Sequence, residues 1–140
     1  MDIDSTIREM YASMSFETGA HPDWERQAAL FAPDARLVRV NDGGVFEFDL
    51  RTFRGDFETM ISSGVLSSFW EHELWRETRV FGDFAHVLSI YEMRSSRAGD
   101  VVARAVKSIQ LFRRGDRWLI SAMLWRREGQ NVRIQMPFAE

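Results

Sequence analysis

The first third of the chain carries apolar residues at helical spacing. Ile7, Met10, Tyr11 and Met14 follow the polar run 4–6 and share one face of a helix. This pattern predicts an amphipathic first helix with Tyr11 on its apolar side.

A second and a third helix are predicted further along. Pro22-Asp23 provides a helix start with Asp23 as N-cap, and Pro33-Asp34 is expected to end that helix. Residues 51–63 have the pattern of a short third helix, which carries Phe53 and Phe57.

The remaining segments read as strands. Asn41-Asp42-Gly43-Gly44 is a hairpin turn, and Gly82-Asp83 and Gly115-Asp116 separate longer apolar runs. Helices followed by a long antiparallel sheet indicate an α+β class. The predicted strands are 35–40, 45–50, 69–81, 84–94, 101–114 and 117–128.

The two tight turns also predict a register. Two-residue loops would place Arg79 opposite His86 and Glu73 opposite Glu92, with Arg104 beside Glu92. We take this face as the one that lines a pocket under the helices. A bulge in any strand would swap the faces. The expected ligand-binding residues are Trp24, Trp75, Ile90, Arg104, Ser108, Gln110, Ser121, Met123 and Trp125.

The opposite face of the predicted sheet is apolar too. Three short helices cover only one face, so the other needs a second cover. We therefore expect a homodimer that forms through this outer sheet face. Its expected apolar residues are Leu74, Val87, Tyr91, Ile109, Leu111, Ile120 and Leu124.

Composition narrows the functional classes. The chain has 140 residues, which suits a single domain over 1–140, and 45% of them are hydrophobic. A net charge of -3 argues against nucleic acid as a partner, and the absence of cysteine excludes disulfides and thiolate chemistry. The N-terminus does not resemble a signal peptide and no apolar run reaches membrane-spanning length, so we expect a cytoplasmic protein without a membrane partner.

The order of elements and several segments resemble the nuclear transport factor 2-like superfamily. These segments are 30–35, which reads Leu-Phe-Ala-Pro-Asp-Ala, 81–87, 108–111 and 125–128. The resemblance covers nearly the whole chain. Within the superfamily, the chain resembles the SnoaL-like and ketosteroid isomerase-like groups, and an uncharacterised bacterial branch in particular. It implies a cone-shaped fold with three helices packed on a curved antiparallel sheet around a pocket. It implies no single function, since this scaffold hosts enzymes, binding proteins and assembly domains.

The resemblance to ketosteroid isomerase is limited at the catalytic positions. The tyrosine that donates to the oxyanion there falls near Tyr11. The general base falls near Arg39 and the second oxyanion donor near Ser108, and neither residue has the acid group that this role requires. That proton transfer is therefore not supported.

Two polar groups are candidates for chemistry. If Glu73 and Glu92 are directly opposed, their charges repel and one of the two carboxyl groups holds its proton more strongly. Paired catalytic carboxylates have this property. The alternative is a structural network in which Arg104 and Arg127 neutralise both, and this is the interpretation we favour. His86 could shuttle a proton or be a hydrogen-bonded core residue, and Tyr11 could donate into the pocket or only pack there.

The function that follows is a pocket that binds a small, partly apolar organic molecule. If the protein is an enzyme, we expect cofactor-free isomerisation, cyclisation or dehydration. A non-catalytic ligand-binding protein and a plain dimerisation domain are the alternatives. We expect no cofactor and no metal, because the three histidines have no ligand spacing. The polar tail 129–140 is expected to lie across the pocket mouth or the partner subunit.

Overall fold

The computed structural model describes residues 1–135 and has an α+β architecture. Its helices are α1 (Ile3–Met14), α2 (Trp24–Ala28) and α3 (Leu50–Ser62). Its strands are β1 (Phe31–Asn41), β2 (Gly44–Phe48), β3 (Trp70–Phe81), β4 (Phe84–Arg94), β5 (Val101–Arg114) and β6 (Arg117–Arg127).

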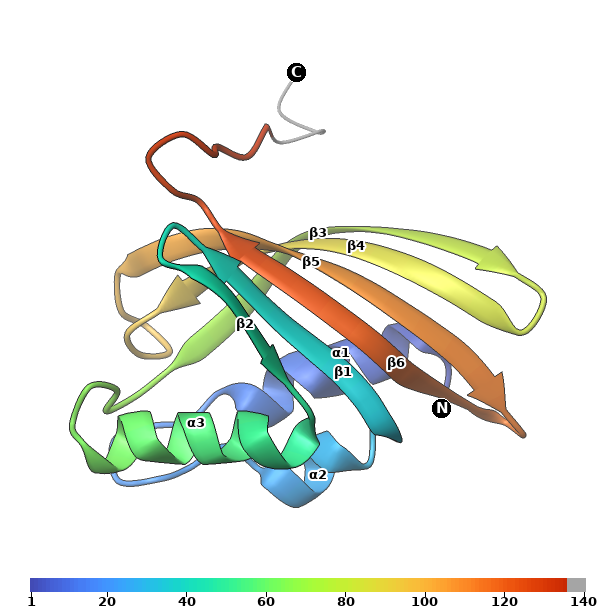
Figure 1. The fold of residues 1–140 in the computed structure, drawn as a ribbon, viewed down its shortest axis with the longest axis horizontal. Helices are drawn as coiled ribbons and strands as arrows, with labels where there is room; N and C mark the ends of the chain where they lie inside the picture. The colour runs from blue at the N-terminus through green and yellow to red at the C-terminus, as the bar shows by residue number, and fades with distance from the viewer. Residues whose placement is uncertain (136–140) are drawn as a thin grey trace.

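All six strands form one curved sheet in the order β2-β1-β6-β5-β4-β3. Neighbours pair antiparallel except β1 and β6, which are parallel. The three helices lie on the same side of this sheet (Figure 1). Within residues 1–135, one sheet face therefore encloses the core and the other has no helix on it.

Side chains at the N-termini of α1 and α3 accept hydrogen bonds from backbone N–H groups of the first turn. Asp2 accepts a hydrogen bond from the Ser5 backbone N–H at 2.7 Å, so α1 begins before the expected run 4–6. Asp49 and Thr52 form a reciprocal capping box at the start of α3.

Helix α2 is shorter than expected. Asp23 caps it as predicted, but it ends at Ala28, and β1 begins at Phe31 rather than after Pro33-Asp34. The Ile120 N–H donates to the Leu30 carbonyl at 2.9 Å, and Phe31 pairs with Ile120. Pairing with β6 thus overrides the helical spacing of the sequence.

The two long hairpins form with the predicted turns. Gly82 and Gly115 have φ of 59° and 64°, the left-handed region that tight hairpin turns require. Arg79 pairs with His86 and Glu92 with Arg104, both as predicted.

Two bulges change the rest of the register. At Leu74 the pairing shifts, so that Glu73 lies opposite Tyr91 and not Glu92. A second shift at Ser121 places Gln110 opposite Ala122 and Met123 opposite Ile109. Each extra residue reverses the alternation of side chains beyond it.

The assignment of the two sheet faces was wrong as well. Val87, Tyr91, Ile109, Leu111 and Ile120 were expected on an outer, dimer-forming face, but they belong to the core cluster beneath the helices and are at most 2% exposed. The face with Trp75, Ile90, Ser108 and Gln110 is the one without helices. Both faces are apolar, so alternation alone does not tell which face the helices cover.

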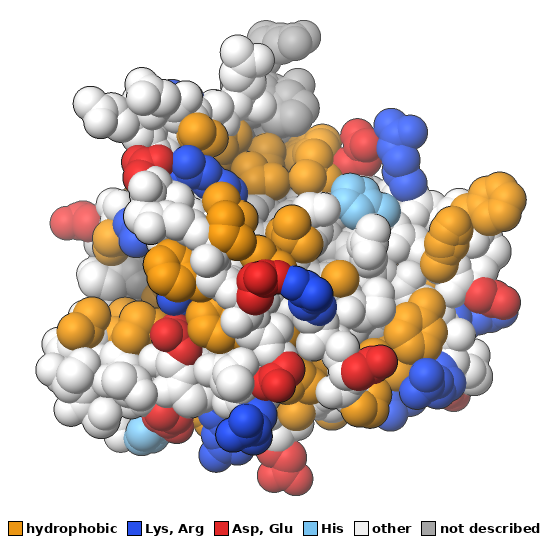
Figure 2. Space-filling view, in the orientation of Figure 1, with side chains coloured by type: hydrophobic (Ala, Val, Ile, Leu, Met, Phe, Trp, Pro, Cys, Tyr) orange, Lys and Arg blue, Asp and Glu red, His pale blue; other side chains and the backbone are white. Residues whose placement is uncertain are grey.

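Charged and hydrophobic side chains are interspersed on the surface in the orientation of the ribbon view (Figure 2). Exposed apolar residues include Phe81 and Phe84 at the β3–β4 turn. Among residues 1–135, no helix has the length and apolar character needed to cross a membrane.

Candidate functional site

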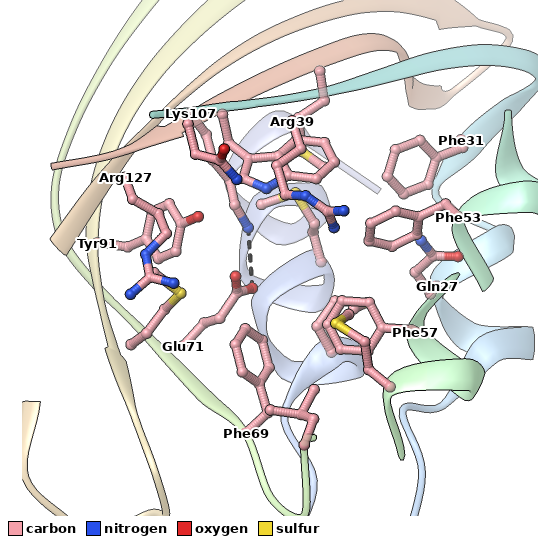
Figure 3. A pocket seen from close by; sticks show the side chains of 18 of the residues that line it. Gln27, Phe31, Arg39, Phe53, Phe57, Phe69, Glu71, Tyr91, Lys107 and Arg127 are labelled. Atoms are coloured by element: carbon pink, nitrogen blue, oxygen red, sulfur yellow. Dashed lines mark hydrogen bonds and ion pairs between the residues drawn. The ribbon is translucent and has the colours of Figure 1, made fainter. Parts of the chain in front are cut away.

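A cavity of about 430 Å³ lies between the helices and the inner face of the sheet. Phe31, Phe53 and Phe57 form its aromatic end, next to the helices (Figure 3). Polar side chains gather at the opposite end, on β3, β4, β5 and β6. We call this the polar end, and it consists of Glu71, Tyr91, Lys107 and Arg127.

A buried ion pair dominates the polar end. The Lys107 Nζ atom donates to Glu71 Oε1 at 3.0 Å, and the two side chains are 3% and 7% exposed. Lys107 Nζ also lies 4.2 Å from the ring centroid of Tyr11 and 4.5 Å from that of Tyr91. One carboxylate and two aromatic faces thus stabilise the ammonium group.

A chain of hydrogen bonds continues from Tyr11 toward the surface. The hydroxyls of Tyr11 and Ser89 are 2.6 Å apart, and Ser89 donates to Glu73 Oε2 at 2.5 Å. Glu73 pairs with Arg76 at 2.6 Å, and Arg76 also pairs with the exposed Asp4. The Tyr11 hydroxyl is therefore occupied by a structural partner and does not lie free in the cavity.

Burial shifts the acidity of three of these groups. It lowers the pKa of Lys107 below the usual 10.5, and the nearby Glu71 carboxylate opposes the shift. Burial, reinforced by the charge of Glu71, raises the pKa values of Tyr11 and Tyr91 well above 10. At neutral pH both tyrosines therefore keep their hydroxyl protons.

Tyr91 and Arg127 have unused hydrogen-bonding capacity. In the part of the chain that the structure describes, the Tyr91 hydroxyl makes no hydrogen bond and Arg127 makes no ion pair. Arg39 also lines the cavity, but it pairs with Asp56 at 3.0 Å and stacks on Phe46 and Phe48. Arg127 is thus the cavity cation that is available to a ligand.

Few of the expected ligand-binding residues line this cavity. Met123 and Trp125 do, because the bulge at Ser121 turns them inward. Trp24 is buried behind Phe53 and Phe57, whose rings lie 6.2 and 5.9 Å from its own. The other six, namely Trp75, Ile90, Arg104, Ser108, Gln110 and Ser121, do not line it.

The predicted charged row is divided between the two faces of the sheet. Glu73 faces the helices, whereas Glu92 lies on the other face and pairs with Arg94 at 2.5 Å. Arg104 pairs with Glu128 at 3.3 Å, and Arg127 is exposed and lines the cavity. The two glutamates are not opposed, so they form no carboxylate pair.

His86 lies on the face without helices. It shares a shallow depression there with Gln110 and Ser121. Its Nε2 atom is 2.9 Å from the Ser108 hydroxyl, and Ser121 donates to the Gln110 carbonyl. His86 therefore bonds Ser108 and not Gln110 or Ser121, and the cavity lies on the other side of the sheet.

The sequence interpretation did not include Glu71, Lys107 or Tyr91 in a polar site. One signal could have identified Lys107. It is the only lysine in a chain with 18 Lys and Arg residues, and the residues two positions before and after it, Ala105 and Ile109, are apolar.

No cluster of three or more metal-ligating side chains occurs within residues 1–135. The tail residues up to 135 do not line the cavity, and residues 136–140 lie outside the described part of the chain. The expected position of the tail therefore stays a prediction for those last residues.

Solved structures show the same fold. A cystatin-like fold protein from Nostoc punctiforme has a TM-score of 0.70 and 14% identity, over 91% of this chain and 90% of that one. A candidate dehydratase of the nuclear transport factor 2-like family from Streptomyces avermitilis has a TM-score of 0.65 and 15% identity, over 90% and 93%. A candidate ketosteroid isomerase from Shewanella frigidimarina has a TM-score of 0.61 and 14% identity, over 86% and 91%.

No family model and no curated protein matches the chain. Sequence identities this low establish the fold alone. The chain therefore has the nuclear transport factor 2-like fold, as its sequence predicts.

Proposed function

We propose that the cavity binds a small, partly apolar organic molecule that carries one carboxylate or similar anionic group. The observation that supports this is Arg127, which lines a largely apolar cavity and has no ion-pair partner among residues 1–135. Lys107 and Arg39 are already neutralised by Glu71 and Asp56. The cavity thus offers one uncompensated positive charge beside a large apolar wall.

A pair of matched probes tests the proposal. Naphthylpropanoate combines an aromatic body with a carboxylate, and naphthylpropanamide has the same shape without the charge. We expect titration calorimetry to show tighter binding of the carboxylate. Arg127→Gln should weaken it about tenfold, or ~1.4 kcal/mol, because a charge-assisted hydrogen bond is lost.

Arg126→Gln provides the matched control. Arg126 is the neighbouring arginine on β6, but it points to the opposite face, where it pairs with Asp42. Its replacement should leave the affinity unchanged. Equal affinity for acid and amide, or equal effects of the two variants, would refute the proposed anion site.

Cofactor-free proton transfer is the second function we propose for this cavity. It is favoured by the Tyr91 hydroxyl and the Glu71 carboxylate, a donor and an acceptor that line the same polar end. Candidate isomerases and dehydratases among the structural neighbours support the same chemistry. NMR detection of solvent deuterium entering the methylene group of naphthylpyruvate tests it, with Glu71→Gln expected to abolish any excess over the protein-free rate.

For the quaternary structure we propose that a second copy of the chain covers the sheet face without helices. Trp75, Leu88, Val106 and Phe112 are only half-buried there, and Leu124 is 45% exposed. Apolar surface of this kind is stabilised by a partner that packs sheet to sheet.

A further inference from the structure

The chain contains a single lysine. Of the 18 Lys and Arg residues, 17 are arginines, and these include all basic residues that reach the surface. The only lysine, Lys107, is buried on the inner face of the sheet and lines the cavity.

An amine and a guanidinium differ in one property that matters inside a cavity. Arginine keeps its proton at every physiological pH, whereas a buried lysine releases its proton readily and then becomes a nucleophile. Here burial lowers the pKa of Lys107, and the Glu71 carboxylate lies 3.0 Å from Nζ to receive the proton.

We propose that Lys107 is a reactive amine that condenses with an aldehyde or ketone group of the ligand to form an imine. The geometry that supports it is an amine at the polar end of a cavity whose other end is lined by Phe31, Phe53 and Phe57. The inference rests on the proposed binding function and adds a carbonyl to the ligand beside the anionic group.

The condensation balances with groups already in place. The Lys107 ammonium gives one proton to Glu71, and the free amine attacks the carbonyl carbon, so that a C–N bond forms. The attacking nitrogen then releases one of its protons to the former carbonyl oxygen, which gives a neutral carbinolamine. Glu71 then returns its proton to this hydroxyl, which leaves as water, and a protonated imine remains opposite the Glu71 carboxylate.

The surroundings stabilise the protonated imine as well as the starting ammonium group. Both are single positive charges at the same position, 4.2 Å and 4.5 Å from the Tyr11 and Tyr91 rings. The carboxylate and the two aromatic faces that stabilise the ammonium group therefore also stabilise the protonated imine.

Reductive trapping tests the proposal. The protein is incubated with naphthylpyruvate and sodium cyanoborohydride, which reduces an imine to a stable secondary amine. We expect one adduct by intact mass spectrometry, located at Lys107. A protease that cleaves only after lysine cuts the untreated chain once, and it should fail to cut the labelled chain.

The N-terminal amine of Met1 is an internal reference. Labelling of Lys107 should exceed labelling of Met1 roughly tenfold in the folded protein, because binding places the carbonyl beside Nζ. Concentrated urea and an excess of naphthylpropanoate should each remove this preference. These comparisons use the wild-type chain, so they remain decisive if a Lys107 variant does not fold.

Lys107→Arg is the matched variant, since it keeps the charge but cannot form an imine. It should lose the adduct at this position. If naphthylpropanoate binds and Lys107 is labelled no more than in urea, the reactive amine is refuted while the binding function stands. If neither probe binds, both are refuted.

Discussion

Removing one member of the Glu71–Lys107 pair should destabilise the fold far more than removing both. Glu71→Gln leaves the buried ammonium without a counterion, and Lys107→Met leaves the carboxylate unpaired. Each side chain is less than 10% exposed. Because an uncompensated buried charge is costly, each single change should lower the free energy of unfolding by about 3 kcal/mol.

The geometry sets an upper limit on the coupling between the two groups. At 3.0 Å and an effective dielectric constant of about 20, the attraction is roughly 5.5 kcal/mol. Desolvation of both charges offsets much of it, so the double variant should lose only about 1 kcal/mol. The double-mutant cycle should then give a coupling of about 5 kcal/mol, near but below the electrostatic limit.

Urea unfolding at neutral pH, followed by tryptophan fluorescence, measures all four proteins. The dependence on urea must have the same slope throughout, so that the differences report stability. The exposed pair Glu77–Arg79, whose side chains are 47% and 80% exposed, is the control. Glu77→Gln should change stability by less than about 0.5 kcal/mol. Additive losses in the double variant would refute the coupling.

Three further predictions concern alkaline stability, a helix cap and the free sheet face. Burial raises the pKa of Tyr91 in the folded protein above its value in the unfolded chain. The stabilising contribution of the neutral hydroxyl is therefore complete below pH ~10 and is lost as the pH rises through the folded pKa. Tyr91→Phe should flatten the fall of Tm between pH ~9 and ~11. Asp49→Ala should cost about 1 kcal/mol in urea unfolding, because it removes the capping box of α3, whereas Asp49→Ser should cost less. The wild type should sediment as a dimer and Leu124→Glu as a monomer; a monomeric wild type contradicts the proposed interface.

Leu111, which the sequence analysis placed on the outer, dimer-forming face, is not a position at which a substitution would test a dimer. Leu111 is 2% exposed and belongs to the core beneath the helices. A glutamate there would destabilise the fold itself, so Leu124 is the informative position on the free face.

The fold was predictable because its turns are specified by a few neighbouring residues in the sequence. Turn residues such as Gly82 and Gly115 take a backbone conformation that few other residues adopt, and they fix both long hairpins to within a residue. The resemblance to the nuclear transport factor 2-like superfamily supplied the arrangement of helices and sheet, and the solved structures agree.

The site was less predictable because it depends on which sheet face the helices cover. Several buried positions on the covered face hold small residues. Ala85, Ser89 and Ala105 leave room on the inner face, where α1 brings Tyr11 within hydrogen-bond distance of Ser89. Packing between elements far apart in the sequence determines which sheet face is covered. The alternation of apolar and polar residues along a strand does not reveal it.

The bulge at Leu74 connects these observations to function. Without the extra residue, Glu73 would pair with Glu92 as its position suggests, and both would face away from the helices. With it, Glu73 turns inward to accept from Ser89, which in turn holds the Tyr11 hydroxyl. Tyr11 is thereby fixed with its ring against Lys107. One inserted residue on β3 thus removes a carboxylate pair from the outer face and positions the aromatic wall of the buried amine.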